Sequence, residues 1–233
     1  MKKNILFIGG STGIGLATVK LLHEKYNVIV ASRSNENLLD LNVKHINFNV
    51  LNDELNTDLI PETLHGFAYF PGSINLRPFR SLKINVFEED LNLNFLSMVK
   101  TLQKVLNNLK KSNNASVVLF STVAVKVGMP FHTSVSASKG AIEGFAKSLA
   151  AECAPNIRVN VIAPSLTDTP LANKFLNNDI KKEKVGNRHP LKRPGNAEDI
   201  ANSTAFLLSD ESSWVTGQIL GIDGGMSTLN TSN

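Results

Sequence analysis

The chain has 233 residues, of which 42% are hydrophobic and 19% charged, with a formal net charge of +4. This globular composition argues against disorder, and the basic excess lacks the stripe with interleaved aromatic residues that is typical of nucleic-acid-binding surfaces. The only cysteine, Cys153, excludes an intramolecular disulfide and favours a reducing compartment. No segment is long and apolar enough to be a membrane span. We therefore expect a cytoplasmic protein whose partners include neither nucleic acid nor membrane.

Apolar, β-rich runs alternate with stretches of helical periodicity along the chain. The expected elements are strand 4–8, helix 13–24, strands 27–31, 45–48 and 66–70, helix 87–108, strand 116–120, helix 134–152, strand 158–162, helix 197–208 and strand 218–222. The strands are near-continuous apolar runs, which is typical of strands buried on both faces. This order predicts an α/β protein with a three-layer Rossmann fold, a doubly wound parallel sheet of about seven strands with helices on both faces.

No linker rich in glycine, serine or proline divides the chain, so we expect one dinucleotide-binding domain over residues 1–233. The longest stretch without strand character in the C-terminal half is 165–195, which contains three prolines and an expected short helix at 171–176. A long segment after the carboxyl end of a strand suits a substrate lid. A plain surface excursion is the alternative interpretation.

A glycine-rich turn lies between the first expected strand and the first expected helix. Glycines at this place allow a tight turn, a close approach of backbone N–H groups to phosphate, and close packing of helix on strand. The N-terminus of the helix adds partial positive charge. The turn therefore predicts nucleotide binding, with a merely flexible turn as the alternative. The expected contacts are Gly9, Ser11, Thr12, Gly13, Ile14 and Gly15.

The second expected strand ends in Ser32-Arg33-Ser34, without the acidic residue that the dinucleotide motif places there for a free ribose 2′-hydroxyl. A guanidinium group instead offers a planar fork of donors for a 2′-phosphate. We therefore expect NADP(H) as the cofactor, with contacts from Ser32 and Arg33. A surface arginine in a turn is the alternative.

Together these features resemble the short-chain dehydrogenase/reductase family, and the 3-oxoacyl carrier-protein reductases in particular. The resemblance implies hydride transfer between NADP(H) and a carbonyl or alcohol substrate, without a metal. It also implies a homo-dimer or homo-tetramer. By the same resemblance, further cofactor contacts are expected from Asn49, Val50, Gly72, Lys139, Pro164, Thr167 and Thr169.

The resemblance fails at one position of the catalytic centre. The family uses serine, tyrosine and lysine, with tyrosine and lysine one helical turn apart. Here Lys139 is present, but Val135 stands at the tyrosine position and Thr122 at the serine position. Asn92 matches the family's active-site asparagine. Valine carries no proton to transfer, and general acid–base assistance is typically worth about 10²–10⁴ in rate.

Two interpretations of this loss stay open. In the first, the chain is an enzyme with a different proton donor, and His132, three residues before Val135, is a candidate because imidazole exchanges protons near neutral pH. His132 is equally suited to binding the loop backbone before the helix. In the second interpretation, the chain is a catalytically silent NADP(H)-binding sensor or partner protein. The joint presence of Asn92, Thr122 and Lys139 favours the enzyme.

Overall fold

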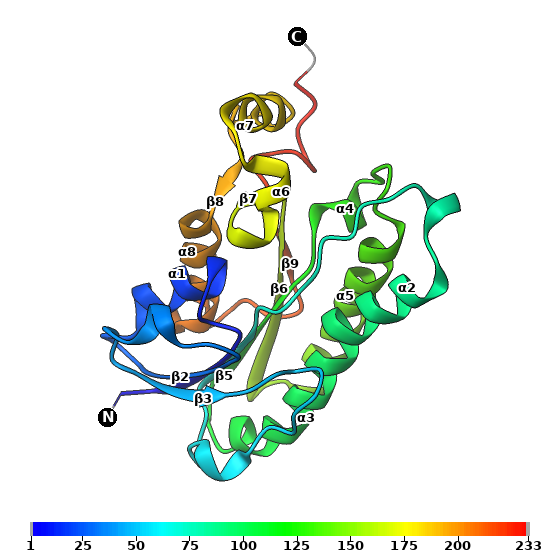
Figure 1. Ribbon diagram of the computed structural model, residues 1–233. Coiled ribbons are helices and arrows are strands. Elements are labelled where there is room, and N and C mark those ends of the chain that lie inside the picture. The colour runs from blue at the N-terminus through cyan, green and yellow to red at the C-terminus, as the bar shows by residue number, and fades with distance from the viewer. Residues whose placement is uncertain (1, 232–233) are drawn as a thin grey trace.

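The computed structural model describes residues 2–231 and contains a seven-stranded, wholly parallel sheet with the order β3-β2-β1-β4-β5-β6-β9 (Figure 1). The doubly wound parallel fold expected from the sequence is thereby confirmed. The strands of this sheet are β1 (Asn4–Ile8), β2 (Asn27–Ser32), β3 (Val43–Asn47), β4 (Gly66–Tyr69), β5 (Ala115–Phe120), β6 (Ile157–Pro164) and β9 (Ile219–Ile222).

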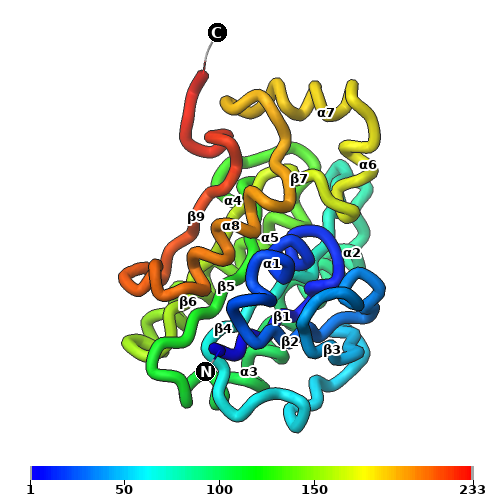
Figure 2. Tube along the Cα trace, turned by 90° about the vertical axis from the view of Figure 1, so that its left-hand side faces the viewer, coloured from blue at the N-terminus to red at the C-terminus, as the bar shows by residue number. Residues whose placement is uncertain are grey.

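Helices cover both faces of the sheet, as Figures 1 and 2 show from two directions. On one face, α1 (Gly13–Leu22) and α8 (Ala197–Leu208) pack against Ile5 and Phe7 of β1. On the other face, α3 (Ser97–Lys110) and α5 (Thr133–Cys153) pack against Leu6 and Ile8. Successive side chains of a strand point to opposite faces, so a strand buried between two helical layers must be apolar at every position.

The expected helix 87–108 is three consecutive pieces. It consists of α2 (Ile84–Leu91), one π-helical turn (Asn92–Leu96) and α3. A π turn holds one residue more than an α turn, so it rotates the side chains that follow it, and such turns are frequent at functional sites. This local change decides which asparagine of the segment faces inward.

The segment 165–195 contains more structure than the sequence pattern indicated. The expected short helix is present as a 3₁₀ turn (Pro170–Ala172) followed by α6 (Asn173–Leu176), and a further helix, α7 (Asp179–Gly186), follows it. Its ends are joined by the two-residue strands β7 (Thr167–Asp168) and β8 (Gly195–Asn196), which pair in parallel. The remaining short helices are α4 (Val123–Lys126) and the 3₁₀ turns Glu36–Leu38, Thr57–Leu59, Phe79–Ser81 and Asp210–Ser212.

The strand order reverses beside β1, which pairs with β2 on one side and with β4 on the other. In doubly wound sheets, ligands bind outside the carboxyl ends of the strands at such a switch point. The residues that follow β1, β2 and β4 should therefore share one crevice. Within residues 2–231, no helix combines the length and apolarity needed to cross a membrane.

Candidate active site

A cleft of about 790 Å³ lies at the carboxyl ends of the strands, between the glycine turn, α5 and the segment 165–195. The structure brings every residue expected to contact the cofactor to this cleft. They are Gly9, Ser11, Thr12, Gly13, Ile14, Gly15, Ser32, Arg33, Asn49, Val50, Gly72, Lys139, Pro164, Thr167 and Thr169. Three of the four expected catalytic residues, Thr122, His132 and Lys139, also line it.

Two positions in the turn between β1 and α1 require glycine. Gly9 has a φ of 72°, in the left-handed region that side chains disfavour, and a Cβ there would lie 3.0 Å from the ring of Pro71. A Cβ on Gly15 would lie 2.4 Å from the carbonyl oxygen of Gly9, which is closer than real contacts allow. The first turn of α1 carries no acidic residue. Its N-terminus can therefore receive an anion without repulsion from its own helix.

Hydroxyl groups and one guanidinium surround the end of β2. Ser32 Oγ donates to the carbonyl of Ser34 at 2.8 Å, and the hydroxyls of Ser11 and Ser34 are 3.5 Å apart. Arg33 is exposed at the edge of the cleft, and its guanidinium has no hydrogen-bond or ion-pair partner among residues 2–231. This donor set fits a ribose phosphate, because it offers several N–H and O–H groups and no carboxylate.

Lys139 places a buried ammonium group against the cleft. Its side chain is 8% exposed, and Nζ donates to the carbonyl of Phe120 at 2.9 Å. Burial lowers the pKa of Lys139 to about 8, and the negative charge of Asp90 opposes that shift. Gly72 makes room for this group, because a Cβ at that position would lie 3.4 Å from Lys139 Nζ.

The asparagine beside the site is Asn94 and not the expected Asn92. Asn92 is exposed and does not line the cleft. Asn94, two residues further on in the π turn, is fully buried, and its Oδ1 accepts from the backbone N–H of Ser73 at 3.1 Å. Its Nδ2 donates to Ser138 Oγ at 3.0 Å, one residue before Lys139. The π turn directs this second asparagine toward α5, beside Lys139, and leaves Asn92 at the surface.

A buried carboxylate, missed in the sequence, completes a polar network behind the cleft. Asp90 is 1% exposed, and it accepts hydrogen bonds from Ser73 Oγ at 2.5 Å, Asn75 Nδ2 at 2.7 Å and Ser134 Oγ at 2.5 Å. Ser73 Oγ also accepts from Asn94 Nδ2 at 3.0 Å, and Ser73 lines the cleft. The network thus connects a buried negative charge to the cleft surface through one hydroxyl.

Val135 lines the cleft at the place of the missing phenol, and neither tyrosine of the chain replaces it. Tyr69 is buried, donates its hydroxyl to the carbonyl of Leu93 at 2.7 Å, and has its pKa raised by burial. Tyr26 packs against the core on the α1 and α8 face. The cleft is therefore without a phenol.

Two side chains near Val135 carry groups able to handle a proton or a carbonyl oxygen. Thr122 Oγ1 accepts from the backbone N–H of Ala124 at 3.3 Å. The hydroxyl hydrogen of Thr122 is not used in this bond and can be donated to another acceptor. His132 Nδ1 lies 2.7 Å from the carbonyl of Pro130. A carbonyl accepts hydrogen bonds only, so Nδ1 carries the hydrogen, and Nε2 is available to the cleft. Within residues 2–231 no group of histidine, cysteine and acidic side chains is placed to hold a metal ion.

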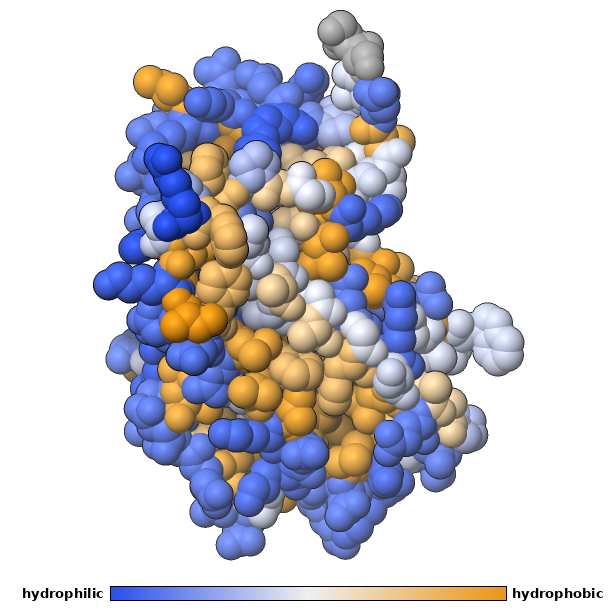
Figure 3. Space-filling model, turned by 90° about the vertical axis from the view of Figure 1, so that its right-hand side faces the viewer, coloured by the Kyte–Doolittle hydropathy of each residue, from blue (hydrophilic) through white to orange (hydrophobic). Residues whose placement is uncertain are grey.

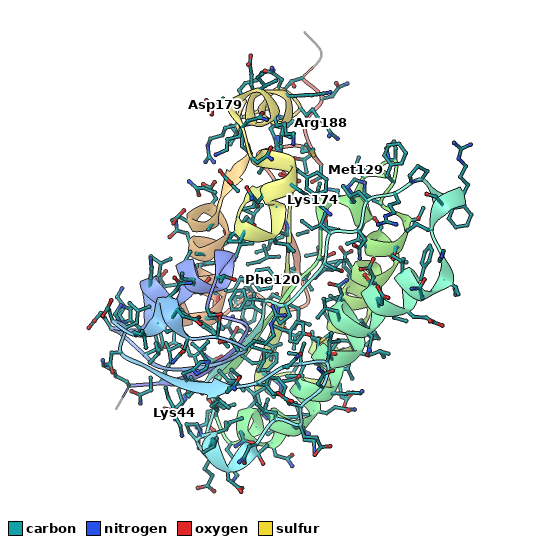
Figure 4. The ribbon with its side chains drawn as sticks, viewed as in Figure 1. Lys44, Phe120, Met129, Lys174, Asp179 and Arg188 are labelled. Carbon is teal, nitrogen blue, oxygen red and sulfur yellow. The ribbon has the colours of Figure 1, made fainter. Side chains whose placement is uncertain are left out.

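The segment 165–195 closes over the cleft by polar contacts at two places. Lys174 in α6 donates to the carbonyl of Ile74 at 2.8 Å, across from the loop after β4. The buried ring of His189 bridges Ser165 Oγ at 2.6 Å and the carbonyl of Val185 at 2.8 Å, and so fixes the base of α7 to the end of β6. Figure 4 labels Lys174 on this segment and Met129 beyond α4.

A family model described as enoyl-(acyl carrier protein) reductase matches residues 9–227. Among curated proteins, the chain is 32% identical to the 3-oxoacyl-(acyl-carrier-protein) reductase FabG of Thermotoga maritima, over 96% of this chain and 97% of that protein. It is 30% identical to the protein of the same name from Chlamydia trachomatis, over 97% of this chain and 98% of the relative.

Solved structures share the fold along nearly the whole chain. A short-chain dehydrogenase family protein from Francisella tularensis matches with a TM-score of 0.86 and 28% identity, covering 98% of this chain and 100% of that one. The structure of ElxO with NADP bound matches with a TM-score of 0.89 and 24% identity over 98% of this chain and 100% of that chain, a likeness of fold alone.

Proposed function

Because the chain belongs to the short-chain dehydrogenase/reductase family, we propose that it is an NADP(H)-dependent oxidoreductase that interconverts a carbonyl and an alcohol with a proton donor other than tyrosine. The observation that carries this proposal is the convergence on one cleft of the glycine turn, Arg33 and the buried Lys139. None of the residues lining that cleft in the described part of the chain is acidic, which suits a nucleotide with several negative charges.

The proposed binding mode follows from the groups that line the cleft. The N-terminus of α1 would hold the pyrophosphate, and Arg33 with Ser32 would hold the ribose phosphate. Lys139 Nζ would bind the hydroxyls of the nicotinamide ribose and keep positive charge beside the ring. When bound, the nucleotide supplies or accepts the hydride.

NADP(H) is proposed over NAD(H) because of Arg33. The neighbouring structures alone do not decide between the two, since ElxO was solved with NADP bound and 4-hydroxyisoleucine dehydrogenase with NADH. A guanidinium without a partner at the end of β2 favours the phosphorylated form, because it forms a charge-assisted pair with a phosphate and gains nothing comparable from a hydroxyl.

The proton is assigned to His132 and the orientation of the carbonyl to Thr122. The Thr122 hydroxyl can donate to a substrate oxygen from the end of β5. Protonated at both ring nitrogens, His132 can deliver the Nε2 proton to that oxygen during reduction. With Nε2 unprotonated it can remove the proton during oxidation, and in both forms Nδ1–H stays bound to the carbonyl of Pro130. Asn94 and Ser138 hold the polar surroundings of Lys139 in place.

We also propose that the chain acts as a homo-dimer or homo-tetramer. Figure 3 shows a broad apolar surface on the face formed by α3 and α5. Leu91 and Leu96 are about two-fifths exposed there, and Phe95, Val99 and Phe145 are only partly buried. A contiguous exposed apolar patch commonly marks an interface between protein chains.

The proposed function is tested first by calorimetry with NADPH and NADH, and then by NADPH oxidation against a panel of ketones. Tighter binding of NADPH and turnover that collapses in His132→Ala would support the proposal. Tight NADPH binding without turnover across a broad panel would support a silent NADP(H)-binding protein, which the absence of a phenol in the cleft favours. No affinity for either nucleotide would rule out both functions.

A further inference from the structure

The charged side chains that line the cleft are all cationic. Arg33 and Lys139 are assigned to the nucleotide, which leaves Lys181, Lys184 and Arg188 of the segment 165–195 without a role. No aspartate or glutamate of residues 2–231 lines the cleft. A cleft lined by charges of one sign concentrates ligands of the opposite sign. The three additional cations therefore require an anionic ligand group beyond those of the nucleotide.

These three cations lie on α7 and just beyond its end. Lys181 and Lys184 are three residues apart on α7, the spacing of one helical face, and Arg188 follows two residues after the helix ends at Gly186. Val185 lies between them and also lines the cleft. The acidic residues of α7, Asp179 and Glu183, do not line the cleft. Charges of both signs mixed on all sides would indicate only a solvated helix. The segregation observed here indicates a binding face.

Two of the three cations have no side-chain partner among residues 2–231. Lys181 Nζ donates to the carbonyl of Lys174 at 3.1 Å and to Asn177 Oδ1 at 2.8 Å, so two of its three hydrogen-bond donors are already used. Lys184 and Arg188 have neither a hydrogen-bond nor an ion-pair partner for their side chains in the described part of the chain. By contrast, Lys182 on the same helix forms an ion pair with Asp168 at 2.6 Å.

The position of α7 separates these cations from the site assigned to the ribose phosphate. In Figures 1 and 2, α7 lies at the top of the molecule and β2, after which Arg33 follows, lies near the bottom. Figure 4 labels Arg188 at this upper end. Apolar side chains of Met129, Leu171 and Phe175 also line the cleft. A ligand there would combine a carbon skeleton with an anionic end.

We propose that the carbonyl or alcohol substrate carries a phosphate or carboxylate group, and that Lys184 and Arg188 bind this group while the reacting carbon lies toward Lys139. The inference rests on the proposed function for its reaction, but the anion site has a geometry of its own. The fork of Arg188 suits two oxygens of one oxyanion, and Lys184 adds a single strong donor.

The test compares matched probes by calorimetry, with the protein both free and saturated with NADP⁺. The phosphate arm uses dihydroxyacetone phosphate against dihydroxyacetone, and the carboxylate arm uses acetoacetate against methyl acetoacetate. We expect at least one anionic probe to bind about tenfold more tightly than its neutral partner, as one charge-assisted contact provides. The Lys184→Gln/Arg188→Gln variant should remove that preference. Lys182→Gln is the matched control, since it removes a charge from the same helix outside the cleft.

The outcomes separate this inference from the proposed function. Equal affinity for charged and neutral probes in both arms would overturn the inference, even if NADPH binds tightly. An equal loss of preference in Lys182→Gln would also overturn it, because general electrostatic attraction would then explain the effect. Failure of NADPH binding would overturn the proposed function, while selective anion binding to the free protein that the Lys184→Gln/Arg188→Gln variant loses would still support the anion site at these two residues.

Discussion

The hydroxyl of Ser73 donates to the buried carboxylate of Asp90 at 2.5 Å. This bond joins the loop after β4 to α2, and Asp90 extends the connection into α5 through Ser134. Burying an ionised carboxylate is unfavourable unless hydrogen bonds replace the lost water, and Asp90 accepts three of them. The pair therefore fixes one wall of the cleft relative to the helix that carries Lys139.

Removing the carboxylate should destabilise the protein strongly. For Asp90→Ala we expect the free energy of unfolding to fall by about 3 kcal/mol, because three donors, one of them on the buried Ser134, lose their acceptor. Asp90→Asn keeps one oxygen and should lose less. Urea unfolding measures both variants. Glu88→Gln, an exposed position on α2, is the control that should stay near wild type, and a loss in that variant equal to Asp90→Ala would contradict the explanation.

The glycine turn provides a second pair of variants with opposite outcomes. Gly15→Ala should abolish nucleotide binding or folding, since its Cβ would lie 2.4 Å from the carbonyl oxygen of Gly9. Gly144→Ala in α5 meets no atom within 4 Å and should raise stability by about 0.5–1 kcal/mol. Thermal unfolding and calorimetry with NADPH distinguish the two. A Gly15→Ala variant with unchanged NADPH affinity would refute the close approach described for the turn.

Arg33 should determine the selectivity between the two nucleotides. We expect Arg33→Asp to weaken NADPH binding by about 2 kcal/mol, roughly thirtyfold, because a carboxylate repels the 2′-phosphate. NADH binding should stay unchanged or improve, because the carboxylate accepts a hydrogen bond from a free 2′-hydroxyl. Calorimetric dissociation constants for both nucleotides measure the change. Arg80→Asp, at an exposed position outside the cleft, makes the same change of charge. An equal effect there would disprove a local role for Arg33.

Most of the fold was predictable because strands buried on both faces leave long apolar runs in the sequence. The helix α7 was not, since it has only Ile180 and Val185 as large apolar residues and no amphipathic period. The extra residue of the π turn likewise leaves no mark in the composition, so two asparagines in Asn92-Leu93-Asn94 were equally suited to the site.

One signal in the sequence does distinguish these asparagines. Polar residues at 90, 94, 97 and 101 are spaced by four, three and four, which places Asp90, Asn94, Ser97 and Thr101 on one helical face. All four are buried. A polar stripe on the inward face of a helix indicates a hydrogen-bonded network, and Asn92 is not part of it. The loss of the tyrosine, by contrast, was visible in the sequence, because the lysine one turn later fixes the register.

The buried charge of Lys139 should make stability depend on alkaline pH. Its pKa is about 8 in the folded chain and about 10.4 in the unfolded chain, so the unfolded state binds more protons between these values. The free energy of unfolding contributed by this group therefore rises with pH across that window, by at most roughly 3 kcal/mol.

Urea unfolding at pH 7 and pH 10 gives the free energy of unfolding of wild type and of Lys139→Met. The difference between the two proteins at each pH isolates the contribution of Lys139 from that of other titrating groups. We expect the wild type to gain stability relative to the variant as the pH rises. Asp90 is the acidic group whose charge acts on Lys139, so the same comparison in an Asp90→Asn background should show a larger gain. A constant difference at both pH values would contradict the lowered pKa.

Val135→Tyr should supply the phenol that the cleft lacks. Val135 lines the cleft in the first turns of α5, four residues before Lys139, so the two side chains lie on the same face of the helix. That ammonium group lowers the pKa of a neighbouring phenol and favours proton transfer. We expect turnover of ketones with NADPH to rise, and in a His132→Ala background to rise by about 10²–10⁴-fold, the typical worth of a positioned acid. Val135→Phe adds the same ring without the hydroxyl and should give no gain.

If both variants were equally active, cleft shape rather than proton transfer would limit the parent chain. If Val135→Tyr activity also became insensitive to His132→Ala, the phenol would have replaced the imidazole as the donor.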